Sequence, residues 1–379
     1  MTNRRIAISD IVIGQPLQWD VYGADGGLLL RKGYVVASAN QVSTLIERGL
    51  FADMDKADAA NRDKKPVPKP IEIPSVVHKI NQARSTLRTL SFNIATESDA
   101  YNRLIALAKD VAVATFLDPD IALGCILLNQ EESYASRHCV DTAVVALLVA
   151  RALKKSPDEM ILLTAAALTM NVSMMRQQEK LQERSEALSP AEQAFIQNHP
   201  LESVNILRSI GVDDEDWLAW VLHHHENEDG SGYPNKTSSA VTPTNAKIIS
   251  IADRYCARVC ARSYRKSLLP NAALRDILIG GKNTLDPMLV MLFIRELGTY
   301  PIGTFVRLEN GEIGVVTSKG ATTTTPYVHA LIGPRGAPLA MSIKRDTQKS
   351  LMAIREVLHR DQVPVRFTMR QLWGEMASL

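Results

Sequence analysis

The sequence predicts a mainly α-helical protein, with a small α/β module before the helices and a small β-rich appendage after them. Between Ser75 and about Glu296, apolar residues recur at intervals of three and four, the period of helices with one buried face. Before residue 59 and after residue 297, short apolar runs alternate with glycine-containing turns. We therefore divide the chain into a module over 1–58, a linker over 59–74, a helical domain over 75–297 and an appendage over 298–379.

Length and composition narrow the class of protein. A chain of 379 residues suits two or three domains, and its formal net charge of +2 disfavours bulk nucleic acid as a partner. The four cysteines form no CxxC pair, and the N-terminal residues lack the apolar core of a signal peptide. The apolar runs Thr142–Leu153 and Met160–Met170 are too short to span a bilayer. We expect a cytoplasmic protein without a membrane span.

The N-terminal module has the pattern of a short sheet followed by a helix. We expect strands over Ile6–Ile13, Gln18–Tyr22 and Leu28–Leu30, a hairpin turn at Ala24–Gly27 and a helix over Ala39–Arg48. No catalytic constellation is visible there, so we expect a docking or regulatory role. The linker that follows has prolines at alternate positions, which favour an extended, semi-stiff spacer.

The helical domain shows repeated helix-start signals. Ser156-Pro157 and Ser189-Pro190 each combine an N-cap residue with proline at the first helical position. Helices are expected over Val76–Ala95, Ala100–Phe116, Asp118–Leu128, Ser136–Leu153, Ser156–Met175, Ser189–His199, Leu201–Ile210, Asp214–His224, Thr244–Ala261, Asn271–Ile279 and Asp286–Glu296.

The C-terminal appendage begins with hairpin signals. Strands are expected over Gly303–Leu308, Gly311–Thr317 and Tyr327–Leu331, with the first turn at Glu309–Glu312. Leu351–His359 and Met369–Met376 are expected as terminal helices.

A histidine-rich stretch directly after one predicted helix carries the strongest chemical signal. His223, His224 and His225 are followed by acidic residues and by a turn containing Gly230 and Gly232. Imidazole is the commonest protein ligand for transition metals, and the glycines permit close backbone approach. The stretch therefore predicts a ligand-binding loop beside a metal, against the alternative of a surface loop with a fortuitous histidine run.

The letters HHENEDGSGYP in this stretch closely resemble the signature of HD-GYP proteins, bacterial cyclic di-GMP phosphodiesterases related to HD-domain metal hydrolases. The resemblance extends from about Ser133 to Glu296, less than half of the chain. It implies a helical HD-GYP bundle in which histidines and aspartates from several helices hold two or three metal ions. A carboxylate bridges such a pair of ions, because a neutral side chain cannot hold two dications together.

Several of the family's metal ligands are matched here. The resemblance assigns metal-binding roles to His138, His199, His224, His225 and Asp253. For any one of them alone, a hydrogen-bonded core or surface residue is the simpler interpretation. Together, in the family's order and spacing, they predict one pocket.

The family's His-Asp dyad is not matched. At its positions this chain has Met170 and Asn171, and two further acidic positions of the family are Tyr134 and Cys256. A thioether is a poor ligand for these ions, and an amide has no charge with which to bridge them. With Asp253 as the one matched carboxylate, two dications would repel each other. The sequence therefore predicts either one divalent ion (Zn, Fe or Mn) on His199, His224 and His225, or an empty pocket.

The predicted nucleotide-binding residues match the family's pattern more fully than the dyad and acidic positions do. Arg262-Ser-Tyr-Arg265 resembles the family's Arg-Pro-Tyr-Arg segment, whose basic residues contact nucleotide phosphates, and Gly230, Gly232 and Tyr233 belong to the recognition loop. Arginine suits phosphate through its bidentate fork. The simpler alternative is arginines on a solvated face.

From this resemblance we expect a degenerate HD-GYP protein of cyclic di-GMP signalling that hydrolyses little or nothing. Its ligand would be cyclic di-GMP or a related nucleotide, and its partners would include GGDEF diguanylate cyclases that dock on the GYP loop. Two alternatives stay open: an active phosphodiesterase with a reduced metal set, and a nucleotide-independent scaffold. A homodimer is also left open.

Overall fold

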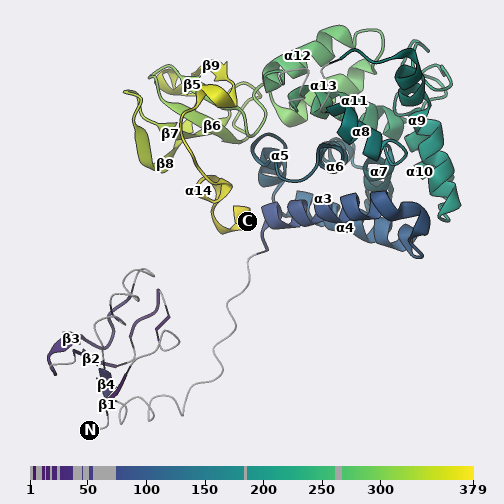
Figure 1. Ribbon diagram of the computed structural model, residues 1–379. Coiled ribbons are helices and arrows are strands. Elements are labelled where there is room, and N and C mark those ends of the chain that lie inside the picture. The colour runs from purple at the N-terminus through teal and green to yellow at the C-terminus, as the bar shows by residue number, and fades with distance from the viewer. Residues whose placement is uncertain are drawn as a thin grey trace. The chain divides into compact units, whose positions relative to one another are not determined.

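The computed structural model describes residues 3–5, 11–12, 14–17, 19–23, 26–36, 45, 51–53, 74–182, 186–260 and 267–379. The chain divides into two compact units, 1–72 and 73–379 (Figure 1). The second unit contains both the helices and the C-terminal sheet. The finer boundaries predicted at residues 58, 74 and 297 stay predictions.

The first unit contains a four-stranded antiparallel sheet in the order β1-β4-β2-β3. Its strands are β1 (Asn3–Arg5), β2 (Val21–Tyr22), β3 (Leu28–Leu30) and β4 (Phe51–Asp53). The predicted hairpin between β2 and β3 is present, and the amide of Gly23 donates to the carbonyl of Gly27 across it. Most of the predicted strand Ile6–Ile13 and of the predicted helix Ala39–Arg48 lies outside the described residues, as does the linker.

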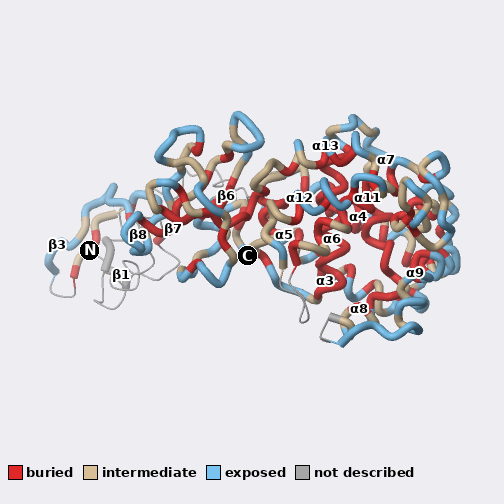
Figure 2. Tube along the Cα trace, turned by 90° about the horizontal axis from the view of Figure 1, so that it is seen from above, coloured by how far each residue is buried: buried red, intermediate tan, exposed pale blue. Residues whose placement is uncertain are grey.

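The second unit is built on a helical bundle. Its helices are α3 (Val76–Asn93), α4 (Ala100–Leu117), α5 (Pro119–Leu128), α6 (Tyr134–Ala152), α7 (Pro157–Thr169), α8 (Met175–Gln182), α9 (Pro190–Ser209), α10 (Glu215–His223), α11 (Thr244–Val259), α12 (Pro270–Gly280) and α13 (Pro287–Leu297). Helix α6 is buried along almost its whole length and packs against α7 and α11 (Figure 2). It is the central element on which the other helices assemble.

Two features of the bundle differ from the sequence prediction. The helices expected over Ser189–His199 and Leu201–Ile210 are one helix, α9, which continues through Pro200. The helix expected over Ser156–Met175 ends at Thr169, and a turn then leads into α8, which was not predicted. Packing of the apolar sides of these segments overrides local helix-breaking and helix-forming preferences.

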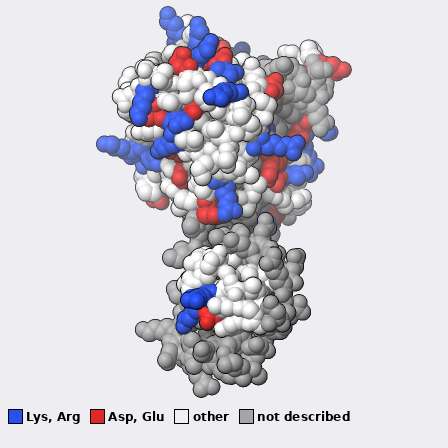
Figure 3. Space-filling model, turned by 90° about the vertical axis from the view of Figure 1, so that its left-hand side faces the viewer, with Lys and Arg blue, Asp and Glu red and all other residues white. Residues whose placement is uncertain are grey.

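The C-terminal part forms a five-stranded antiparallel sheet in the order β8-β7-β6-β5-β9. The strands are β5 (Phe305–Leu308), β6 (Ile313–Ser318), β7 (Tyr327–Ile332), β8 (Pro338–Asp346) and β9 (Ile354–Leu358), followed by α14 (Met369–Trp373). On the face seen in Figure 3, basic and acidic side chains are interspersed.

The expected helix over Leu351–His359 is wrong, because residues 354–358 form β9. This strand pairs with β5, so that Val306 lies opposite Val357, and Arg307 forms an ion pair with Glu356 at 2.6 Å. The segment contains several helix-forming residues, but the open edge of β5 supplies backbone partners that a helix in this position would leave unpaired. The edge strand β8 was not predicted.

The sheet and the bundle share one hydrophobic core. Val306, Val316 and Val328 belong to the same buried cluster as the core helices. The indole of Trp373 lies against Gly124 of α5, where an added Cβ would come within 2.9 Å of the ring. The C-terminal sheet is therefore a packed part of the second unit.

Among the described helices, none is by itself long and apolar enough to cross a bilayer. The pair α4 and α5, bent by 105° at their junction, meets the length and composition criteria only together.

Candidate metal centre

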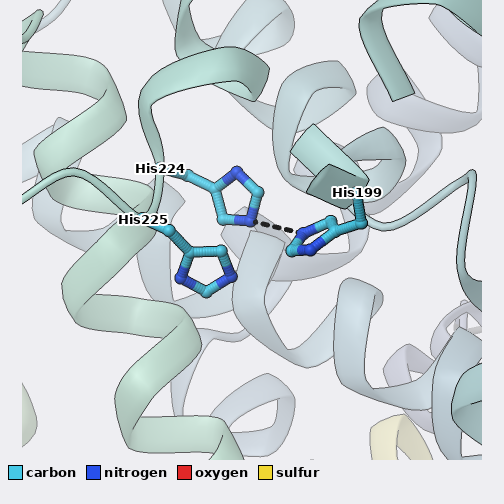
Figure 4. A group of neighbouring side chains, drawn as sticks. All are labelled: His199, His224 and His225. Atoms are coloured by element: carbon cyan, nitrogen blue, oxygen red, sulfur yellow. Dashed lines mark hydrogen bonds between the residues drawn. The ribbon is translucent and has the colours of Figure 1, made fainter. Parts of the chain in front are cut away.

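Three histidines converge between α9 and the end of α10. His199 lies in the middle of α9, His224 directly follows α10, and His225 begins the next loop. One side-chain nitrogen from each lies within 4.8 Å of the others, and the rings point toward one another (Figure 4). We call this group the three-histidine cluster.

The orientation of His199 follows from the proline beside it. Pro200 has no amide hydrogen, so the carbonyl of Ile196, four residues earlier, lacks its usual helical partner. The Nδ1–H of His199 donates to that carbonyl at 2.6 Å. Because a carbonyl can only accept, the hydrogen is on Nδ1, and the lone pair of Nε2 faces the cluster.

The same arrangement holds for His224. Its Nδ1–H donates to the carbonyl of Val221 at 2.6 Å, in the last turn of α10, where helical carbonyls lose regular partners. Its Nε2 lies 3.3 Å from Nε2 of His199. Two lone pairs at this distance repel unless a proton or a cation lies between them. Backbone carbonyls commonly hold metal-binding imidazoles in this way, so the cluster fits one divalent ion.

Burial opposes a proton at this position. It lowers the pKa of His199 to about 3, with the neighbouring His224 acting in the same direction. Burial likewise lowers the pKa of His224 and of His225. The three rings are therefore neutral at physiological pH, the form in which histidine binds metals.

The buried His199 makes the metal-free protein sensitive to acid. Its pKa is about 3 when folded and about 6.5 when unfolded, so the unfolded chain binds more protons between these values and stability falls as the pH falls. We expect the free energy of unfolding to drop by about 2 kcal/mol from this residue alone between pH 7 and pH 5. Urea denaturation with a chelator measures it. In His199→Gln the loss should shrink by a similar amount, and an unchanged loss would contradict the assignment.

His138 and Asp253 form a second buried group. The Nε2–H of His138 donates to Oδ1 of Asp253 at 2.7 Å. This hydrogen bond connects α6 to α11. Burial by itself would raise the pKa of Asp253, but the hydrogen bond from His138 and the adjacent imidazoles outweigh it and hold the pKa well below its usual range. Asp253 is therefore ionised, and His138 is directed at it. The five predicted metal ligands thus lie in two adjoining groups.

The four side chains predicted to stand at the family's acidic and dyad positions are all buried. Met170 and Asn171 follow α7, and the Oδ1 of Asn171 has no hydrogen-bond partner among the described residues. Tyr134 stacks on the ring of His138, with centroids 5.6 Å apart. Burial raises the pKa of the Cys256 thiol well above its ordinary value, so it stays uncharged. Of the residues predicted to line the centre, Asp253 alone is a carboxylate.

The loop after His225 is organised by its own acidic residues. The carboxylate of Glu226 accepts from the amides of Asn235 at 2.7 Å and Thr237 at 2.9 Å. Glu228 forms an ion pair with Lys247 at 2.9 Å. These contacts give the two glutamates structural roles. We call residues 226–234 the GYP loop.

Tyr233 closes the GYP loop over the cluster. Its ring stacks on His225 with centroids 4.6 Å apart, and its amide donates to the carbonyl of His225 at 3.2 Å. Burial raises the pKa of its hydroxyl. Tyr233 therefore forms an apolar wall beside the imidazoles and presents a neutral phenol.

Gly232 has no room for a side chain. A Cβ there would lie 2.5 Å from the backbone at His225, Glu226 and Asn227. We expect Gly232→Ala to cost about 2 kcal/mol or more of unfolding free energy, because backbone atoms would have to move. Urea denaturation measures this. Gly280→Ala is the matched control, since nothing lies within 4 Å of its added Cβ; equal stability of the two variants would contradict the prediction.

Gly230 supports the same turn with a positive φ of 73°.

The predicted phosphate-binding residues Arg262 and Arg265 lie outside the described residues. The structure instead draws attention to Arg254, whose guanidinium donates to Oδ1 of Asn227 at 2.6 Å. Arg254 was not among the predicted site residues, although its position directly after Asp253 could have indicated it.

Comparisons with known proteins identify the kind of domain in which this site lies. Residues 123–289 match a family model described as HD domain. The chain is 26% identical over 231 residues to cyclic di-GMP phosphodiesterase PA4108 of Pseudomonas aeruginosa, covering 60% of this chain and 55% of that one. It is 25% identical over 204 residues to 3'3'-cGAMP-specific phosphodiesterase 1 of Vibrio cholerae, covering 50% and 47%. The matches thus span about half the length of these curated relatives.

A solved structure supports the fold. Bd1817, an HDG"Y"P protein from Bdellovibrio bacteriovorus, superposes with a TM-score of 0.50 at 15% identity, covering 77% of this chain and 98% of that one. Residues 123–289 therefore form an HD domain. Within that class, this region is similar to proteins named as cyclic di-GMP phosphodiesterases, at 24–26% identity in two of them.

Proposed function

We propose that this protein is a degenerate HD-GYP protein that binds a cyclic dinucleotide and signals through protein contact, with little or no phosphodiesterase activity. The composition of the metal centre carries the proposal. The three-histidine cluster suits one ion, Asp253 is already bonded to His138, and Met170 and Asn171 stand at the dyad positions. A second dication would lack a bridging carboxylate.

The residues that would hold one ion are His199, His224 and His225. Three neutral imidazoles suit zinc, iron or manganese, and a bound ion would polarise a phosphate oxygen or a water. The chain's own groups do the rest: the carbonyls of Ile196 and Val221 orient two of the rings, and Tyr233 covers the third.

The ligand we propose is cyclic di-GMP or a related cyclic dinucleotide such as 3'3'-cGAMP. Relatives of the HD domain act on these molecules. The proposed contacts are Gly230, Gly232 and Tyr233 of the GYP loop together with Arg262 and Arg265. The GYP loop is also the surface on which we propose that a GGDEF diguanylate cyclase docks.

Purified protein supplied with zinc, iron or manganese tests the proposal in two assays. We expect cyclic di-GMP to bind in calorimetry, while its hydrolysis stays at least about 100-fold below that of an active relative such as PA4108 measured in parallel. Brisk turnover that is lost in His224→Ala and Asp253→Ala would instead favour an active phosphodiesterase with a reduced metal set. Absence of binding would favour a nucleotide-independent scaffold.

A further inference from the structure

Arg254 lies at the junction of the three-histidine cluster and the GYP loop. It follows Asp253 on α11, is partly buried, and interacts electrostatically with His224, His225 and Tyr233. One of its terminal nitrogens donates to Oδ1 of Asn227 at 2.6 Å. Arg254 thus places a cation close to both the three-histidine cluster and the GYP loop.

The other described cations of α11 are neutralised by carboxylates. Lys247 pairs with Glu228 at 2.9 Å, and Arg258 pairs with Asp276 at 2.5 Å. Arg254 has no carboxylate within ion-pair distance among the described residues, although Asp253 and Asp229 act on it from further away. Burying an unpaired charge is costly, so a guanidinium kept in this state favours a site that receives an anion.

We propose that Arg254 binds a phosphodiester group of the cyclic dinucleotide and connects occupancy of the site to the GYP loop. The inference rests on the proposed nucleotide binding and names a residue that carries it. A guanidinium has five donors in a planar fork, and the bond to Asn227 uses one of them. The others suit two oxygens of one phosphodiester.

The connection to the loop runs through Asn227. Its Nδ2 donates to Oγ of Ser231 at 2.8 Å, and its carbonyl accepts from the amide of Gly230 at 3.0 Å. Arg254 thus holds the start of the GYP loop and also interacts electrostatically with His224 and His225 of the cluster. A phosphodiester that binds the guanidinium therefore acts on the same bond network that shapes the docking surface.

Calorimetric titration of the full chain with cyclic di-GMP and with 3'3'-cGAMP tests the inference. We expect Arg254→Met to weaken binding about 10- to 100-fold, the range of a hydrogen-bonded charged contact, and Arg254→Lys to lose less because the charge remains. Arg258→Gln is the control on the same helix and should bind within about twofold of the parent. The affinity of the parent should also fall more steeply with added salt than that of Arg254→Met.

Asn227→Ala separates ligand contact from loop support. It removes the bond between Arg254 and the loop but leaves the guanidinium in place, so we expect it to retain most of the affinity while loop amides exchange hydrogen faster. If Asn227→Ala weakens binding as much as Arg254→Met, then Arg254 only holds the loop and the inference is wrong. If Arg254→Met fails to fold, Arg254→Gln decides, because it removes the charge but can still donate to Asn227: parental affinity and parental salt dependence would overturn the inference.

Titration of the parent protein separates nucleotide binding from the specific contact made by Arg254. If the parent protein binds neither dinucleotide, nucleotide binding itself is wrong, and the role of Arg254 is wrong with it. If the parent binds and Arg254→Met binds equally well, the proposed function stands and this inference alone is overturned.

Discussion

Replacing Met170 by His and Asn171 by Asp should raise manganese uptake from about one to about two ions per chain and hydrolysis of cyclic di-GMP at least about 100-fold. The pair returns an imidazole and a carboxylate to the end of α7, where Asn171 contacts Cys139, the neighbour of His138. A second carboxylate near Asp253 relieves the repulsion between two dications. Metal analysis after dialysis and chromatography of the reaction products measure both effects.

The same double variant should depend on metal for its stability. Without an ion, the new carboxylate is buried close to the ionised Asp253 and costs about 3 kcal/mol; with manganese, most of this loss should be recovered. Met170→Leu with Asn171 retained is the neutral control and should respond to manganese as the parent does. Two tightly bound ions or rapid turnover in the parent itself would show that the unaltered centre is not degenerate.

Arg84→Met should lower the free energy of unfolding by about 3–5 kcal/mol, a large part of the stability of an ordinary domain. Arg84 and Asp141 form an ion pair at 2.6 Å, and both side chains are almost completely buried between α3 and α6. The guanidinium also donates to the carbonyl of Asn129 at 3.0 Å. Removing it leaves the Asp141 carboxylate buried and uncompensated on α6, one turn after His138.

Denaturation of a second variant identifies the cause. Arg84→Met combined with Asp141→Leu removes both charges and should recover most of the lost stability, since an apolar pair can replace a buried ion pair. Arg88→Met, one turn further along α3, is the matched control: its side chain is 56% exposed and lies 3.9 Å from Glu132, so we expect a change below about 0.5 kcal/mol. A double variant as unstable as the single one would exclude the charge explanation.

The sequence predicted those parts of the fold that depend on neighbouring residues. Helix α7 begins where Ser156 accepts from the amide of Glu159, and α9 begins with a complete capping box at Ser189 and Glu192. Strand β9 was missed because its partner, β5, lies about fifty residues earlier and local propensity favours a helix. The continuation of α9 through Pro200 likewise depends on packing that no local pattern reveals.

The candidate site likewise contains residues predicted from a local motif and residues whose role depends on long-range packing. The three-histidine cluster was predicted because a motif places two of its members side by side. The bond between His138 and Asp253 joins residues 115 positions apart and depends on how α6 packs against α11. No local pattern therefore separates these two residues from the cluster. Arg254 was missed because its role depends on the position of Asn227 in the folded loop.

Pro200 determines the orientation of the candidate metal ligand His199 because it lacks a backbone N–H. A residue with a backbone N–H at position 200 would compete with His199 for the Ile196 carbonyl, and the neutral ring of His199 could then carry its hydrogen on either nitrogen. Because proline has no N–H, the carbonyl accepts only from Nδ1 of His199. A missing backbone donor thereby fixes the tautomer of the His199 imidazole whether or not a metal ion is bound.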